Sequence, residues 1–124
     1  MRVSNDVLAA LQAEIRTKDQ AAFALGVAVA EYELAKAGLA LLAETVTRDG
    51  RLLRLGALQD EFDGYRDTHM KIIVRATAAQ AALGEAALAA LGLPAQGRNF
   101  TIDPVTGEVL ELVAGAYVPV QEAA

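Results

Sequence analysis

The chain has no cysteine and no tryptophan, and it has a single histidine, His69, and a single serine, Ser4, among its 124 residues. Without cysteine there is no disulfide, no thiolate zinc site and no cysteine nucleophile. Ser4 lies where a helix is expected to start, and nothing around it forms a nucleophile and base pair. No glycine-rich phosphate loop is present either. We therefore predict a protein that is not an enzyme, with no cofactor and no metal.

Basic residues are also scarce, since 11 Lys and Arg stand against 16 Asp and Glu, for a formal net charge of -5. Nucleic-acid affinity depends mainly on Lys and Arg that neutralise phosphates, so we expect no nucleic-acid partner. The most apolar stretch, residues 21–43, contains Glu31, Glu33 and Lys36, which disfavours a transmembrane span. The amino-terminal residues show no signal-peptide pattern. We expect a cytoplasmic protein with no membrane partner.

The chain is rich in aliphatic residues and poor in aromatic ones. Hydrophobic residues make up 54% of the sequence and the mean hydropathy is +0.29, while aromatic residues make up only 5%. This composition excludes a disordered chain. Because most of the apolar residues are Ala, Leu and Val, it favours thin, closely packed helices over a thick globular core.

A first long helix is predicted over residues 5–47. Ser4 is a suitable N-cap, and Val3 and Leu8 are spaced as a hydrophobic staple around it. A heptad-like apolar series with gaps runs along this predicted helix. Its members are Leu8, Leu11, Ile15, Lys18, Ala22, Leu25, Val29, Tyr32, Lys36, Leu39 and Val46.

The Asp49-Gly50 pair is the strongest break in the helix-compatible region, so we predict that the chain reverses there. The same pair also fits a type I′ turn between two short strands, VTRDGRLLRL. A second helix is predicted over residues 51–91, ending at Gly92 with Pro94 beyond it. Its apolar series has 3-4 spacing without a slip: Leu55, Leu58, Phe62, Tyr65, His69, Ile72, Ala76, Ala79, Leu83, Ala86 and Ala90.

After Pro94 the pattern changes to short strands. Phe100 and Ile102 alternate with polar residues, then Pro-Val-Thr-Gly follows, and then Val109, Leu110 and Leu112. Pro104 and Gly107 suit a turn between two strands. The remaining AGAYVPVQEAA is either a docking strand or a loose tail. The predicted fold is mainly α: a long antiparallel helical hairpin, coiled-coil-like, over residues 1–93, with a small C-terminal β-hairpin and tail over residues 94–124.

The first helix carries apolar residues on more than one face, and two strands alone are marginal, so both parts should be covered by other surfaces. The predicted interface residues are Phe23, Val27, Leu34, Leu41, Leu42, Phe100, Ile102, Val109 and Leu112.

Three sets of polar residues are candidates for chemical sites. A helical metal site of the Glu-x-x-His type needs a carboxylate three residues before His69, but Arg66 occupies that position. We therefore favour a histidine within the apolar series, bonded to a carboxylate such as Glu31, over a metal ligand. The acidic residues Asp60, Glu61, Asp63 and Asp67 lack a calcium-loop spacing, and Asp67 with Lys71 suits an i,i+4 pair on a solvated face. Near the predicted turn, Arg48, Arg51 and Arg54 form a basic tip that suits solubility or an acidic partner.

The segment TIDPVTGEV, preceded by the helix end Leu91-Gly92-Leu93, resembles small helical-hairpin proteins encoded in tailed-bacteriophage morphogenesis regions. The resemblance implies a virion or assembly component that works in a symmetric multimer, and it implies no site residue. We therefore predict a non-enzymatic structural or assembly protein whose partners are copies of itself and other structural proteins. The alternatives are a heteromeric adaptor, inhibitor or chaperone-like module, and a metal-binding helical-bundle enzyme.

Overall fold

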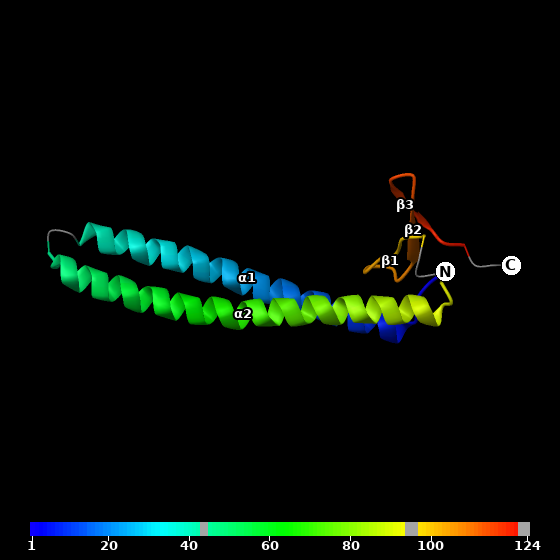
Figure 1. The fold of residues 1–124 in the computed structure, drawn as a ribbon, viewed down its shortest axis with the longest axis horizontal. Coiled ribbons are helices and arrows are strands. Elements are labelled where there is room, and N and C mark those ends of the chain that lie inside the picture. The colour runs from blue at the N-terminus through cyan, green and yellow to red at the C-terminus, as the bar shows by residue number, and fades with distance from the viewer. Residues whose placement is uncertain (43–44, 94–96, 122–124) are drawn as a thin grey trace. The chain divides into compact units, whose positions relative to one another are not determined.

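The computed structural model describes residues 1–42, 45–93 and 97–121. Two long helices, α1 (Asn5–Leu41) and α2 (Arg48–Ala90), pack as an antiparallel hairpin, and three strands follow: β1 (Phe100–Ile102), β2 (Val109–Val113) and β3 (Ala116–Pro119) (Figure 1). The predicted class, a mainly α hairpin with a small C-terminal β element, is confirmed. Pro94 lies outside the described residues.

Helix α1 begins as its sequence predicts. The Ser4 hydroxyl accepts a hydrogen bond from the backbone N–H of Val7 at 3.3 Å, and the Ser4 carbonyl accepts one from Leu8 at 3.0 Å. Ser4 is therefore the N-cap, because it satisfies a first-turn donor that has no partner within the helix. The helix ends at Leu41, six residues before the predicted boundary.

The predicted reversal at Asp49-Gly50 is wrong, because both residues lie in the first turn of α2. Thr47 is the N-cap: its hydroxyl accepts a hydrogen bond from Gly50 N–H at 3.2 Å, and its carbonyl accepts one from Arg51 N–H at 3.0 Å. Asp49 then faces the positive end of the helix dipole. A Cβ on Gly50 would lie 3.1 Å from the Thr47 hydroxyl oxygen, so the glycine gives the capping threonine room. The alternative of two strands joined at Asp49-Gly50 is excluded as well.

The end of α2 has the predicted glycine. Gly92 has a φ of 73°, its N–H donates to the carbonyl of Ala89 at 3.0 Å, and Leu93 N–H donates to that of Leu88 at 3.2 Å. This pair of bonds is a Schellman motif, which satisfies two carbonyls left over at a helix end. Glycine occupies the position because a side chain disfavours positive φ.

The predicted β-hairpin is confirmed and a third strand extends it. Strand β2 lies between β1 and β3 and pairs antiparallel with both, with Ile102 opposite Val109 and Leu112 opposite Tyr117. The tail that the sequence left open as a strand or a loose end therefore forms β3. Ala114 and Gly115 join β2 to β3 with φ values of 52° and 82°, the two positive values that a type I′ turn requires.

Backbone hydrogen bonds attach the first residues of the chain to this sheet. Val3 N–H donates to the carbonyl of Gly107, and Val109 N–H donates to that of Met1, both at 2.9 Å. Val109 is completely buried and forms a core with Val3 and Ala87. Half-buried apolar residues surround this core: Met1, Val7, Leu8, Leu88, Leu91, Leu93, Phe100, Ile102 and Val120.

The chain divides into two compact units. The first comprises Met1–Thr17 and Arg75–Ala124, and so contains the sheet together with the N-terminal part of α1 and the C-terminal part of α2. The second, Lys18–Val74, contains the remainder of both helices and their connection. The core around Val109 belongs to the first unit, and the surface described next belongs to the second.

Candidate functional site: an exposed apolar stripe on helix α1

A continuous row of exposed apolar residues runs along α1 within Lys18–Val74. Its members follow one another at spacings of 4, 3, 4, 3 and 4 residues, which is the heptad pattern of a helix-packing surface. We call this row the α1 stripe: Phe23, Val27, Ala30, Leu34, Ala37 and Leu41. Phe23 and Leu34 are each 74% exposed and Leu41 is 86% exposed. Four of the six are interface residues that the sequence predicts. The two alanines are not among the predicted residues, because a small side chain can be assigned to an interface only when the other residues on the same helix face are known.

The α1 stripe lies on the side of α1 opposite α2. The residues of α1 with reduced exposure in this unit include a row that is spaced in the same way, two positions earlier: Ala21, Leu25, Ala28, Tyr32, Ala35 and Leu39. At 3.6 residues per turn, a shift of two residues is a rotation of about 200°. Since Tyr32 stacks on Phe62 of α2, this earlier set faces α2 and the stripe faces away from it. The heptad-like apolar series predicted for the first helix is therefore wrong at Ala22, Val29 and Lys36, which are exposed.

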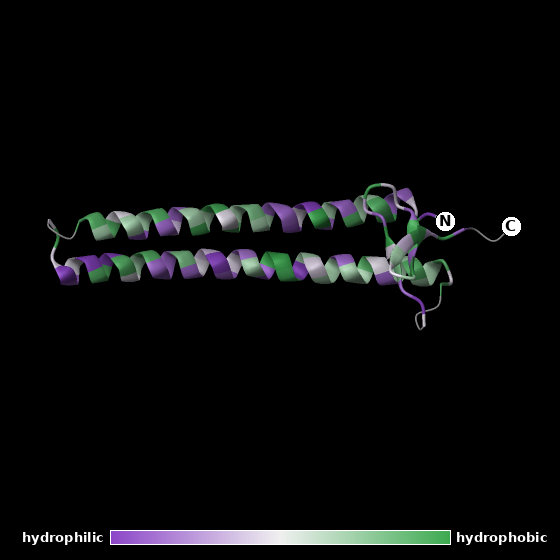
Figure 2. Ribbon diagram, turned by 90° about the horizontal axis from the view of Figure 1, so that it is seen from above, coloured by the Kyte–Doolittle hydropathy of each residue, from purple (hydrophilic) through white to green (hydrophobic). Residues whose placement is uncertain are grey.

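Helix α2 has no comparable row within the same unit. Its exposed apolar residues include Leu53, which is 77% exposed, and Val74, which is 62% exposed. Following the helical spacing from Leu53 to Val74 crosses Asp60, Asp67 and Lys71, so charges interrupt the surface. Figure 2 shows hydrophobic and hydrophilic residues interspersed along both helices. The uncharged length of the α1 stripe is what distinguishes it from scattered exposed side chains.

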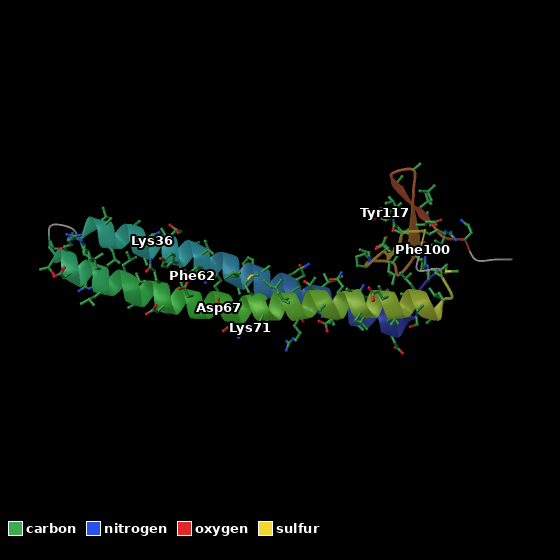
Figure 3. All side chains as sticks on the ribbon, viewed as in Figure 1. Lys36, Phe62, Asp67, Lys71, Phe100 and Tyr117 are labelled. Atoms are coloured by element: carbon green, nitrogen blue, oxygen red, sulfur yellow. The ribbon has the colours of Figure 1, made fainter. Side chains whose placement is uncertain are left out.

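The ends and edges of the stripe are polar. The two positions that would continue its spacing before Phe23 are Gln20 and Arg16. Glu31 and Glu33 flank its centre, and the ammonium of Lys36 lies 3.8 Å from a Glu33 carboxylate oxygen and 5.3 Å from the centroid of the Tyr32 ring (Figure 3). An apolar centre with a polar rim is the arrangement found in protein interfaces.

The sheet carries a second exposed apolar surface, on β2 and β3. Leu112 and Tyr117 face each other across the strand pair and are 37% and 58% exposed. Val113 and Val118 are also exposed, but the alternation of side chains along a strand places them on the other face of the pair. Of the other predicted interface residues, Leu42, Phe100 and Ile102 are half-buried. Val109 is fully buried, so we assign it to the core: it has no surface left for a partner.

His69 does not bind the carboxylate that the sequence suggests. Its Nδ1 lies 2.9 Å from the carbonyl oxygen of Tyr65, which can only accept, so Nδ1 carries the proton. The imidazole also stacks on the Tyr65 ring, with 3.9 Å between centroids. The helix itself therefore supplies both contacts, from one turn earlier.

Two of the four candidate acidic residues on α2, Asp63 and Asp67, form ion pairs on their own helix. Arg66 lies 3.4 Å from Asp63 and 3.6 Å from Asp67. Among the described residues, Asp67 thus pairs with Arg66, not with Lys71 as the i,i+4 spacing predicts. Within residues 1–42, 45–93 and 97–121, no group of three or more His, Asp or Glu side chains is placed to hold a metal ion.

The predicted basic tip follows the connection between the helices. Arg51 Nη1 donates to the carbonyl of Val46 at 2.7 Å, which fastens the connection to the first turn of α2. Arg48 and Arg54 are exposed. The tip therefore has at least one structural contact.

An ion pair beside the sheet, between Arg98 and Glu111, has shifted pKa values. The Arg98 guanidinium donates two hydrogen bonds to the Glu111 carboxylate, one of them at 2.8 Å, and lies 4.8 Å from the centroid of the Phe100 ring. These hydrogen bonds favour the charged forms, so they lower the pKa of Glu111 and raise the pKa of Arg98. The pair joins the segment before β1 to β2.

Helix α2 contains an 18-residue window that is apolar enough, in a helix long enough, to cross a membrane, and 11% of that window is buried. This criterion rests on length and composition only, and core helices also meet it. Comparison with protein-family models, curated proteins and solved structures gives no match. The surfaces described above therefore carry the functional argument.

Proposed function

We propose that this chain is a non-enzymatic structural or assembly protein that forms a homo-oligomer through the α1 stripe. The observation that carries the proposal is the stripe itself, an uncharged heptad row on the side of α1 away from α2. A helix with apolar residues on two opposite faces needs a neighbour on each. Helix α2 supplies one neighbour, and a second copy of the chain supplies the other.

The energetics favour a reversible assembly. Burying a fully exposed Val, Leu or Phe side chain contributes roughly 1.5–3 kcal/mol. The stripe offers four large apolar residues per copy, which are between 43% and 86% exposed, so each contributes less than this full value. Association costs about 4–15 kcal/mol in lost freedom of motion. Because gain and cost are of the same order, the oligomer should form as the protein concentration rises.

The test compares two substitutions of the same kind. Leu34→Glu places a charge in the stripe, and Leu53→Glu places one on α2 at a leucine of nearly equal exposure, 77% against 74%. Solution mass by size-exclusion chromatography with light scattering should show a multimer for the wild type and for Leu53→Glu, and a monomer for Leu34→Glu. Circular dichroism should show similar helix content in all three. A multimer that survives Leu34→Glu would remove the stripe as the interface.

The biological setting that we propose follows from the resemblance at TIDPVTGEV: an assembly component of a tailed-phage particle, found in the host cytoplasm or in the virion. The predicted partners are further copies and other structural proteins. This setting is tested by asking whether the protein co-purifies with phage particles. Recovery of particles without it would argue against a virion role and leave the self-assembly test unaffected.

The alternative is a heteromeric adaptor, inhibitor or chaperone-like module that uses the same exposed surfaces. The exposed Leu112 and Tyr117 favour it, because they offer a second apolar surface on a separate element. A wild type that stays monomeric at every concentration would move this alternative ahead. Binding of the protein to lipid vesicles would instead point to a membrane, in line with the apolar window of α2.

A further inference from the structure

The α1 stripe has an internal pattern that specifies how two copies meet. Along the helix, large and small residues alternate in its central part: Val27, Ala30, Leu34 and Ala37. Phe23 and Leu41 close the two ends with large side chains, both strongly exposed. The row therefore runs large, large, small, large, small, large.

Two copies of such a helix can pack in parallel or antiparallel. In a parallel pair in register, identical residues meet, so Ala30 and Ala37 face their own copies in thin layers on either side of a thick Leu34 layer. Helices at a constant separation cannot fill thin and thick layers equally well, and unfilled layers lose packing energy.

An antiparallel pair centred near Tyr32 removes this mismatch. Residues whose numbers sum to 64 then meet, so Leu34 lies against Ala30 of the second copy and Val27 lies against Ala37 of the second copy. Phe23 lies against Leu41 at both ends. Each layer pairs one core heptad position with the other, as antiparallel coiled coils do, and each alanine meets a larger residue.

We propose that the partner of the α1 stripe is a second copy of the same helix in antiparallel orientation, in the register in which residue numbers sum to 64. This inference rests on the proposed function, since it assumes that the stripe is a self-association surface. It adds the orientation and register, which make the dimer two-fold symmetric and closed.

The flanking charges give the arrangement a second property. In the antiparallel pair, Glu31 lies near Glu31 of the second copy and Glu33 near Glu33 of the second copy, on opposite sides of the centre. Lys36, 3.8 Å from Glu33, offsets part of this repulsion. In the parallel pair the flanking positions opposite these glutamates are Gly26 and Gly38, which carry no charge. Added salt screens like charges, so it should tighten the antiparallel dimer.

Cysteine cross-linking tests the register directly, because the native chain has no cysteine. Val27→Cys and Ala37→Cys are made separately, with tags of different size, and are oxidised alone and after mixing. In the antiparallel register, a cysteine at position 27 or 37 is offset by about 15 Å along the helix axis from the same position in the second copy. It lies opposite the cysteine of the other variant. A disulfide needs Cα atoms within about 7 Å, so only the mixed pair can form one. We expect disulfide dimers mainly between the two variants. Leu53→Cys, which lies outside the stripe, is the control for disulfides that form by random collision.

The outcomes separate this inference from the proposed function. Disulfide formation by each variant alone, with little between them, would show a parallel pair: the register is then overturned while self-assembly stands. A wild type that is dimeric by light scattering and yields no cross-link above the Leu53→Cys control would overturn the register and the stripe together. A wild type that is monomeric at all concentrations would overturn the proposed function itself. A dimer that weakens as salt is added would also contradict the antiparallel arrangement.

Discussion

The rings of Tyr32 in α1 and Phe62 in α2 stack with 4.8 Å between centroids and 16° between planes. The two residue numbers sum to 94, whereas a reversal at Asp49-Gly50 predicts neighbours whose numbers sum to about 99. The register of the hairpin is thus shifted by five, because the chain turns before Thr47. Arg66 lies above the Phe62 ring, 5.9 Å from its centroid, so the pair also anchors a cation.

The first prediction concerns this aromatic pair. In a double-mutant cycle of Tyr32→Leu and Phe62→Leu, we expect a coupling energy of about 0.5–1.5 kcal/mol, the usual value of an aromatic contact beyond its buried area. Urea unfolding of the four proteins measures it. Tyr32→Leu with Tyr117→Leu is the control pair and should be additive. Strict additivity of the first pair would mean that the stack contributes nothing in solution.

The second prediction concerns the start of α2. Thr47→Ala removes the hydroxyl that accepts from Gly50 N–H, so the free energy of unfolding should fall by about 1 kcal/mol. Thr47→Asp keeps an acceptor at the N-cap and should retain most of the stability. Thermal unfolding followed by circular dichroism gives both values. An equal loss in the two variants would indicate that the side chain does not cap the helix.

The third prediction separates the core from the surface of β2. Val109 is fully buried, so Val109→Ala should lower the free energy of unfolding by about 2 kcal/mol through lost burial and a cavity. Leu112→Ala, on the same strand at 37% exposure, should cost clearly less in the monomer. Chemical unfolding at low protein concentration is the measurement. A larger loss for Leu112→Ala would contradict the placement of the sheet core at Val109.

The fourth prediction concerns pH. Hydrogen bonds from Arg98 lower the pKa of Glu111 below its ordinary value of 4.5. A carboxylate whose pKa is lowered by folding stabilises the fold above its ordinary pKa, and this contribution is lost as the pH falls through the lowered value. The carboxyl carbon of Glu111, followed by NMR, should titrate below pH 4.5 in the wild type and move up toward 4.5 in Arg98→Gln.

Arg2→Gln is the matched control for that experiment. Arg2 pairs with Glu108 at 3.4 Å, so its loss removes a guanidinium from the same unit without touching the Arg98 contact. The titration midpoint of Glu111 should not change in this variant. An equal shift in Arg2→Gln and Arg98→Gln would mean that general charge, not the hydrogen bonds, sets the pKa.

The sequence alone determined the two long helices, the N-cap at Ser4, the glycine stop at Gly92 and the pairing of β1 with β2. Each of these depends on interactions within a few residues: a capping hydroxyl, a positive φ, or the alternation of apolar residues. It also indicated which residues of α1 remain exposed, because a helix cannot turn all its apolar faces toward one partner.

Only the tertiary structure decided where the chain reverses, which alanines face α2, and how the sheet is covered. The Asp-Gly pair suits a turn and a first helical turn equally well, and the Thr47 cap selects between them. Ala21 and Ala22 are equivalent until a facing helix buries one of them. The hydrogen bond from Val3 to Gly107 joins residues far apart in sequence, and the local pattern does not encode such a contact. Val109 changed from a predicted interface residue to the centre of the core for the same reason.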